Sequence, residues 1–315
     1  MGRTYSLNGF LNAALRRSSK TVLVEGPSDK YILHRIELER YPTKAGGSAI
    51  DHAGMLDDPL LAGMGNRSKV LEIQARADAL ASAVPKISDV LAILTDREWD
   101  GVSFVAFTPQ PMWCPPVQQK NRFITTGHSI ENYHFDIECA VEFLKYTFPE
   151  HVSAALLAKL QETFNAMLVF ATVLSLKIRD DSCIGRCGGL VDPAHIAIRD
   201  GRVYLDANFG TACAARGIAS AATLAAETNL AVDAAWTELS GKSFTQWLPH
   251  GHIGEEILWS AVAKVALLTG VPVEVTQVIA HGHKKERDRF KAQWLSKLAA
   301  ARRAPLDDAV DWLNA

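Results

Sequence analysis

The sequence has few aromatic residues, few cysteines and no long hydrophobic run, and each shortage excludes a class of protein. Of its 315 residues, 48% are hydrophobic and 8% aromatic, which is enough for a full hydrophobic core. No stretch reaches the roughly 18 consecutive apolar residues of a membrane-spanning helix. The longest candidate, residues 164–176, contains polar residues and is predicted to be a core helix.

The cysteines and the N-terminus favour the cytoplasm. The five cysteines are irregularly spaced, unlike a disulfide framework, and this suits a reducing compartment. The first six residues contain no apolar segment of the kind found in secretion signals. We therefore expect a cytoplasmic protein that has no membrane partner.

The net charge of -2 excludes a protein that is basic throughout, but it allows a local basic face. Residues 281–303 hold eight Lys or Arg against two acidic residues, a local excess of six. On a helix, Phe290, Trp294 and Leu298 would face the core. The candidate nucleic-acid contacts on the other side include Lys284, Lys285, Arg287 and Arg289. A solvated helix or a surface for an acidic partner explains the pattern equally well.

The first part of the chain alternates short apolar runs with helix-period segments, which predicts an α/β fold with a parallel sheet. Ser28 is the expected N-cap of the first helix after a strand, and that helix should end before Pro42. Strands are predicted at 20–25, near 49–52, at 89–95 and at 122–126, and a further helix at 67–84.

Beyond residue 136 the patterns are mainly helical. Helices are predicted at 137–147, 152–179, 217–239, 254–269 and 285–302. A hairpin of 195–198 and 202–205, joined by Asp200 and Gly201, interrupts them. We therefore predict two domains, residues 1–135 with the α/β fold and residues 136–315 mainly helical.

Acidic side chains follow two of the predicted strands. Glu25 closes the first strand, while Asp96 and Glu98 come directly after the strand at 89–95. Ligands of open α/β sheets bind beyond the carboxyl ends of the strands, and residues two apart in an extended chain point the same way. Hard oxygen ligands of this kind suit Mg²⁺ or Mn²⁺ and phosphoryl chemistry. Each carboxylate taken alone is more typical of a solvated loop.

Three short blocks with acidic residues follow one another in the first part of the chain: Val24-Glu25-Gly26-Pro27-Ser28-Asp29, Leu94-Thr95-Asp96-Arg97-Glu98-Trp99-Asp100-Gly101 and His128-Ser129-Ile130-Glu131-Asn132-Tyr133. In this order they resemble the Toprim fold of topoisomerases, primases and OLD-type nucleases. The third block is similar to the Ser-Ile-Glu-Asn-Tyr signature of a Toprim-like family that is often encoded beside an ABC-type ATPase and includes effectors of PARIS anti-phage systems. The resemblance covers residues 20–135.

The resemblance implies a metal-dependent, tRNA-cleaving toxin that an ABC-type ATPase partner holds inactive. Glu25 would be a metal ligand or general acid/base, and Asp96 the principal metal ligand. Glu98 stands where the family more commonly has Asp. Asp29 and Glu131 match further acidic positions and would hold a second ion if the site binds two metals; the sequence does not choose between one metal and two. Asp29 would also lie at a helix N-terminus, where a negative charge is favourable even without a metal.

Other interpretations of the function stay open. An OLD-type DNA nuclease would use the same ligands, and a catalytically silent Toprim subunit that binds an ATPase is the alternative that Glu98 favours. A topoisomerase or primase would need further elements that the sequence does not reveal. No Gly-x-x-x-x-Gly-Lys-Ser/Thr loop is present, so ATPase activity would come from the partner. Residues 136–315 would then bind substrate and partner and mediate any homodimer.

Weaker signals complete the set of candidates. His128 and Lys30 are candidates to stabilise the reacting phosphate, although such residues near helix starts are more often on the surface. Cys183 and Cys187, followed by His195, do not have the usual zinc spacing, so an unliganded loop is expected. The His-Gly-His pairs at 250–252 and 281–283 are expected in polar loops between helices.

Overall fold

The computed structural model describes residues 4–44, 49–218 and 220–315, so the first three residues of the N-terminal segment lie outside it. The chain divides into two compact units. Unit 1 comprises Met1–Arg97, Pro115–Thr126 and Asp288–Ala315, and unit 2 comprises Glu98–Cys114 and Gly127–Arg287. The sequence predicts a single domain boundary after residue 135. In the structure, the chain passes from one unit to the other four times.

Unit 1 is built on a four-stranded parallel sheet in the order β2-β1-β3-β6. The strands are β1 (Thr21–Val24), β2 (Ala49–His52), β3 (Leu91–Thr95) and β6 (Arg122–Ile124). The predicted α/β class and parallel sheet are confirmed. Every residue of β1 and β3 is buried, which explains their uninterrupted apolar sequences. Asp89 and Val90 belong instead to a short helix that precedes β3.

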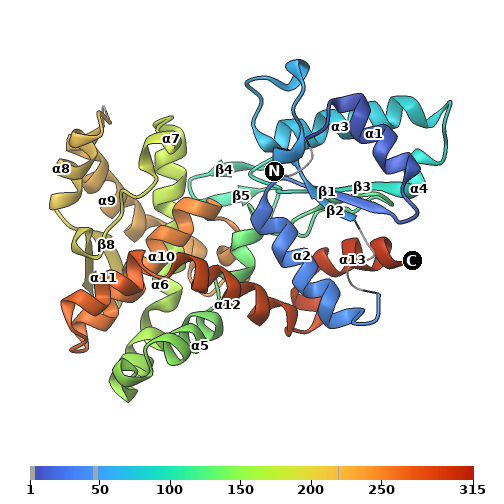
Figure 1. Cartoon of the computed structure of the whole chain (residues 1–315). Coiled ribbons are helices and arrows are strands. Elements are labelled where there is room, and N and C mark those ends of the chain that lie inside the picture. The colour runs from blue at the N-terminus through green and yellow to red at the C-terminus, as the bar shows by residue number, and fades with distance from the viewer. Residues whose placement is uncertain (1–3, 45–48, 219) are drawn as a thin grey trace. The chain divides into compact units, whose positions relative to one another are not determined.

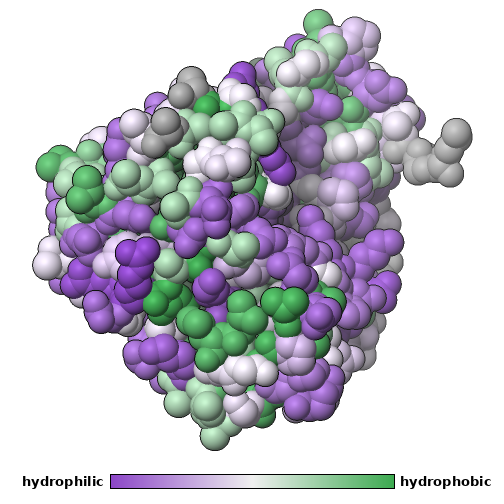
Figure 2. Space-filling model, turned by 90° about the vertical axis from the view of Figure 1, so that its left-hand side faces the viewer, coloured by the Kyte–Doolittle hydropathy of each residue, from purple (hydrophilic) through white to green (hydrophobic). Residues whose placement is uncertain are grey.

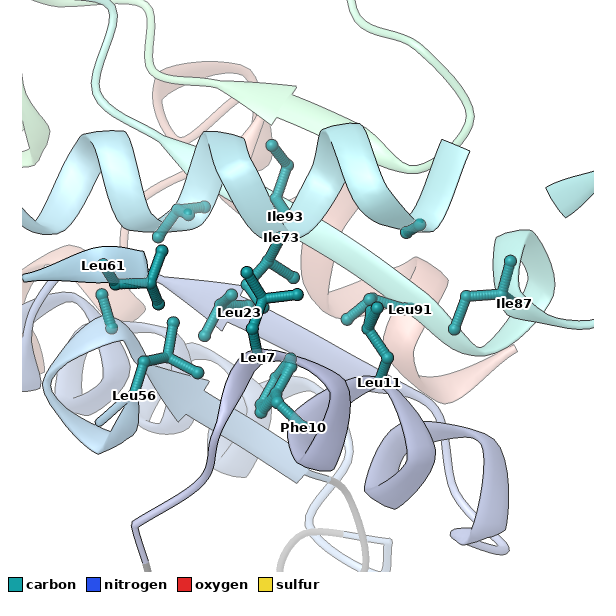
Figure 3. Packing of buried hydrophobic residues seen from close by; sticks show 13 residues of the cluster. Leu7, Phe10, Leu11, Leu23, Leu56, Leu61, Ile73, Ile87, Leu91 and Ile93 are labelled. Atoms are coloured by element: carbon teal, nitrogen blue, oxygen red, sulfur yellow. The ribbon is translucent and has the colours of Figure 1, made fainter. Parts of the chain in front are cut away.

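Helices cover both faces of this sheet (Figure 1). The helices of unit 1 are α1 (Leu7–Arg16), α2 (Pro27–Arg40), α3 (Asn66–Ala81), α4 (Ile87–Val90) and α13 (Leu306–Asn314). Helices α1, α3 and α4 pack on one face, where Phe10, Leu23 and Ile73 belong to a fully buried cluster (Figure 3). Helices α2 and α13 pack on the other face.

Helix α2 begins two residues earlier than expected. Its N-cap is Gly26, not Ser28, because Pro27 occupies the first helical position, where its missing N–H is not needed. The carboxylate of Asp29 accepts a hydrogen bond from the N–H of Gly26 at 2.8 Å. The turn from β1 into α2 is therefore closed by an acidic side chain.

Helix α13 is fastened to α2 by buried charges. The Asp307 carboxylate, which is 4% exposed, accepts hydrogen bonds from Arg40 and Arg303, each at 2.9 Å. Arg40 also binds both carboxylate oxygens of Asp311, at 2.6 and 2.7 Å. The end of the chain thus completes the unit that its beginning starts.

Unit 2 is mainly helical. Its helices are α5 (Ile137–Thr147), α6 (Ala154–Asp180), α7 (Ile184–Cys187), α8 (Asn208–Ala215), α9 (Ala221–Leu239), α10 (Gly251–Leu268) and α11 (Val273–His281). Its hairpins are β4 (Ser103–Val105) with β5 (Thr108–Gln110), and β7 (Ile196–Arg199) with β8 (Arg202–Leu205). Helix α6 packs on α9 and α10 and contains the predicted core segment 164–176. Helix α12 (Lys284–Ser296) runs through the division between the units.

Short 3₁₀ helices connect these elements, and η3 (Ile130–His134) holds most of the third sequence block. The others are η1 (Ala53–Met55), η2 (Pro59–Leu61), η4 (Pro149–His151), η5 (Pro193–His195), η6 (Thr245–Trp247) and η7 (Ala300–Arg302). Within the part of the chain that the structure describes, no helix is long and apolar enough to cross a membrane. The face drawn in Figure 2 is largely hydrophilic, with hydrophobic side chains gathered in smaller patches.

The buried charge of Asp307 yields a prediction about stability. In Asp307→Asn the two guanidinium groups lose their shared carboxylate, and a broken buried ion pair costs about 3 to 5 kcal/mol. We expect the free energy of unfolding in urea to fall by about that amount. The neighbouring, exposed Asp308→Asn is the control and should change it by less than about 1 kcal/mol. Equal effects of the two variants would contradict the proposed role of Asp307.

Candidate metal centre

Two predicted site residues meet at the carboxyl edge of the sheet in unit 1. Because the strands are parallel, their carboxyl ends lie along the same edge, and β1 is the neighbour of β3. Glu25 follows β1 and Asp96 follows β3. Oε1 of Glu25 accepts a hydrogen bond from the backbone N–H of Asp96 at 2.9 Å. This bond joins residues that are 71 positions apart in the sequence.

Further polar residues lie on the helices that adjoin this pair within unit 1. Asp29 is 8% exposed and lies in the first turn of α2, four residues after Glu25. The next residue, Lys30, is half-buried in the same turn. The Nε atom of Arg67, at the start of α3, donates to the carbonyl oxygen of Asp96 at 3.1 Å. The edge therefore combines carboxylates with basic side chains, as a phosphate-binding site would require.

The donor chemistry fits a hard divalent ion. Among the described residues, no group of three or more His, Cys, Asp or Glu side chains is arranged to hold a metal. Mg²⁺ does not need such a group, because it keeps several waters and is usually bound by one or two protein carboxylates together with substrate phosphate. Glu25 and Asp96 could supply those two carboxylates from adjacent strand ends, with Asp29 nearby.

Glu98 does not continue the site in the expected manner. Its backbone is left-handed, with φ of +54°, and its N–H donates to the carbonyl oxygen of His128 at 2.7 Å. The expectation that Asp96 and Glu98 point the same way assumed an extended chain, and the chain is not extended at Glu98. Glu98 is exposed and belongs to unit 2, whereas Asp96 belongs to unit 1.

Glu131 lies in unit 2, against the start of α10. Its Oε1 is 3.2 Å from Nδ1 of His252, in the first turn of that helix. A Cβ atom added to Gly251 would clash with Oγ of Ser129 and come within 2.6 Å of Oε2 of Glu131, so the close approach of this segment to α10 favours glycine. A carboxylate is stabilised at a helix N-terminus by the helix dipole, which gives Glu131 a structural role there.

His128 lies in a buried aromatic cluster of unit 2 and not on the surface. It is 3% exposed, and its ring centroid is 4.3 Å from that of Trp99 and 4.8 Å from that of His250. The guanidinium of Arg179 lies over Trp99 and Phe104, at 5.1 and 5.3 Å. This burial does not fit the expected contact between His128 and a nucleic-acid phosphate.

His250 is a residue whose role sequence reasoning missed. The pair 250–252 is not a polar loop but the start of α10, where Nδ1 of His250 accepts from the N–H of Ile253 at 3.5 Å. The signal was the position of this pair directly before a helical pattern. Burial, and to a lesser degree the nearby His252, lowers the pKa of His250 to about 4.

The basic helix α12 presents a different face from the one expected. Arg287 is 6% exposed, donates to the carbonyl oxygen of Ile279 at 3.0 Å, and lies 4.7 Å from the ring centroid of Trp259. Lys291 is also buried, whereas Phe290 is only half-buried. Arg287 therefore stabilises the fold and does not fit a surface contact. The exposed basic residues of the predicted set are Lys284, Lys285 and Arg289.

Comparisons with known proteins do not assign a family, since no family model and no curated protein matches the chain. The Toprim resemblance therefore rests on the three sequence blocks and stays a prediction.

The lowered pKa of His250 predicts a dependence of stability on pH. Below pH 6.5 the unfolded chain binds a proton at His250 that the folded chain takes up only near pH 4, so folding loses stability as the pH falls through this window. His250→Asn keeps a good N-cap residue but cannot titrate. From pH 7.5 to 4.5, the wild type should lose about 2 to 3 kcal/mol more than the variant in urea unfolding. Parallel pH profiles would contradict the assignment.

Proposed function

We propose that this chain is a Mg²⁺- or Mn²⁺-dependent nuclease with a Toprim-like catalytic unit. We take tRNA as its substrate, and an anti-phage effector of the PARIS kind, restrained by an ABC-type ATPase, as its biological setting. The observation that carries the nuclease proposal is the hydrogen bond between Glu25 and Asp96 at the carboxyl ends of adjacent parallel strands. The biological setting rests on the resemblance of the three sequence blocks.

In this proposal Glu25 and Asp96 hold the ion. A bound divalent cation lowers the pKa of water and neutralises charge on the scissile phosphate. The N–H of Asp96 orients the Glu25 carboxylate, and Arg67 fixes the Asp96 backbone through its carbonyl oxygen. Lys30, in the first turn of α2, would neutralise substrate phosphate. The chain thus contributes preorganised charge on rigid strand ends.

One observation favours a second candidate, a catalytically silent subunit that binds an ATPase. Glu98 replaces the commoner Asp, is exposed and has left-handed backbone geometry, so it departs from the ligand pattern in both residue type and backbone conformation. An OLD-type DNA nuclease would use the same carboxylates as the proposed enzyme, and only its substrate would differ.

Glu25→Gln tests the nuclease. The amide keeps the size of the side chain but removes the charge that would hold the ion, so the rate of tRNA cleavage in Mg²⁺ should fall at least about 100-fold. Cleavage of labelled tRNA, single-stranded DNA and duplex DNA is followed on denaturing gels with Mg²⁺, Mn²⁺ or EDTA.

The matched control is Asp57→Asn, which removes an exposed carboxylate of the same unit and should leave the rate unchanged. Cleavage confined to DNA would select the OLD-type enzyme. If folded wild-type protein cleaved none of the substrates, the silent subunit would replace the nuclease.

The exposed lysines of α12 yield a separate prediction about substrate binding. Lys284→Ala with Lys285→Ala should weaken tRNA binding and lower the slope of log K against log salt by roughly one to two, because two phosphate contacts are lost. Fluorescence anisotropy at several salt concentrations measures both effects. The control pair, Lys145→Ala with Lys242→Ala, removes exposed lysines elsewhere in unit 2. The same loss in both double variants would exclude a specific role for α12.

A further inference from the structure

Three cysteines that are far from the candidate metal centre in sequence come together inside unit 2. Cys183 and Cys187 lie at the two ends of α7, with their Sγ atoms 3.7 Å apart. Cys213, on α8, is close enough to contribute to the raised pKa of Cys187, and Cys183 in turn contributes to the raised pKa of Cys213. All three are buried, whereas Cys114 is exposed. The sequence alone had placed the first two in an unliganded loop and gave no sign of the third.

The pair can close into a disulfide without moving the backbone far. Residues four apart in a helical turn have Cα atoms about 6 Å apart, within the range of roughly 4.4 to 6.8 Å that disulfides adopt. The segment is also held in place. Arg186 donates to the carbonyl oxygen of Gly217 at 2.7 Å, and the N–H of Gly189 donates to Glu256 at 2.6 Å.

We propose that Cys183 and Cys187 form a redox modification site, which a peroxide converts into an intramolecular disulfide. The sulfur of Cys183 attacks the peroxide, an S–O bond forms as the O–O bond breaks, and water leaves. The sulfur of Cys187 then attacks the resulting sulfenic acid, an S–S bond forms as the S–O bond breaks, and a second water leaves. Two thiols are oxidised and one hydrogen peroxide is reduced to two waters.

The order of the two steps follows from the environment of the thiols. The S–H of Cys187 is directed at the Sγ atom of Cys183, which places it to resolve an intermediate there. Burial, and then the neighbouring Cys183, raises the pKa of Cys187 to about 12, so it is a poor first nucleophile. Burial likewise raises the pKa of Cys213 to about 11. The pair should therefore oxidise slowly, and its short loop should make the disulfide readily reducible.

Peptide mapping of the full chain tests this site without reference to nuclease activity. Folded protein is treated with hydrogen peroxide, then denatured in the presence of iodoacetamide so that every remaining thiol is blocked, and digested with trypsin without reductant. Cleavage after Arg186 separates the two cysteines, so the disulfide should join peptide 180–186 to peptide 187–199. The mass of the linked peptides should be lower by two hydrogens than the summed mass of the two reduced peptides, and dithiothreitol should release both peptides. Cys213, in peptide 203–216, should be found alkylated by iodoacetamide and not joined to another peptide.

Two variants complete the test. Cys213→Ser should keep the disulfide, and Cys187→Ser should lose it and leave a sulfenic acid on Cys183 that dimedone traps. If the circular dichroism of Cys187→Ser shows that it is unfolded, Cys187→Ala replaces it. A disulfide that includes Cys213, or oxidised wild-type protein in which Cys183 and Cys187 are never linked, would overturn the proposal.

Discussion

The hydrogen bond from the N–H of Asp96 to the Glu25 carboxylate is the contact around which the candidate site is organised. A hydrogen bond to a charged acceptor contributes about 1.5 to 3 kcal/mol, and this one also fixes direction. It holds the ends of β1 and β3 at a defined separation, and Arg67 binds the carbonyl oxygen of the same residue, in the next peptide group. Helix α2 starts at once after Glu25, because Pro27 and Asp29 close the turn. Carboxylates on such short, doubly anchored segments lose little entropy when they bind an ion.

Unit 1 depends on the end of the chain as much as on its beginning. Helix α13 covers a face of the sheet, and Arg40 of α2 binds both Asp307 and Asp311 from it. Local periodicity shows that a helix is amphipathic but not which sheet it will cover. For that reason the sequence predicted one boundary at residue 135, whereas each unit is formed from segments that are separated in the sequence.

Features that depend on local sequence were predictable, whereas features that depend on contacts between distant residues were not. Strands β1 and β3 were predictable because burial on both faces demands a continuous apolar run. The backbone conformation of Glu98 was not predictable, because the local motif gives no sign of its left-handed geometry or of the hydrogen bond from its N–H to the carbonyl oxygen of His128. On α12, the guanidinium of Arg287 is buried because the carbonyl oxygen of Ile279, in the preceding helix, and the ring of Trp259, in α10, surround it.

The three sequence blocks are connected by two hydrogen bonds, and the second block takes part in both. Within unit 1, Asp96 binds Glu25 of the first block. Within unit 2, Glu98 binds the backbone of His128 in the third block, whose ring packs against Trp99. The chain passes from one unit to the other at the peptide bond between Arg97 and Glu98. A block that is tied to a different partner on each side of one peptide bond tolerates little change in its length. The spacing between Asp96 and Glu98 is therefore fixed by one hydrogen bond within each unit, whereas an independent surface loop would tolerate insertions.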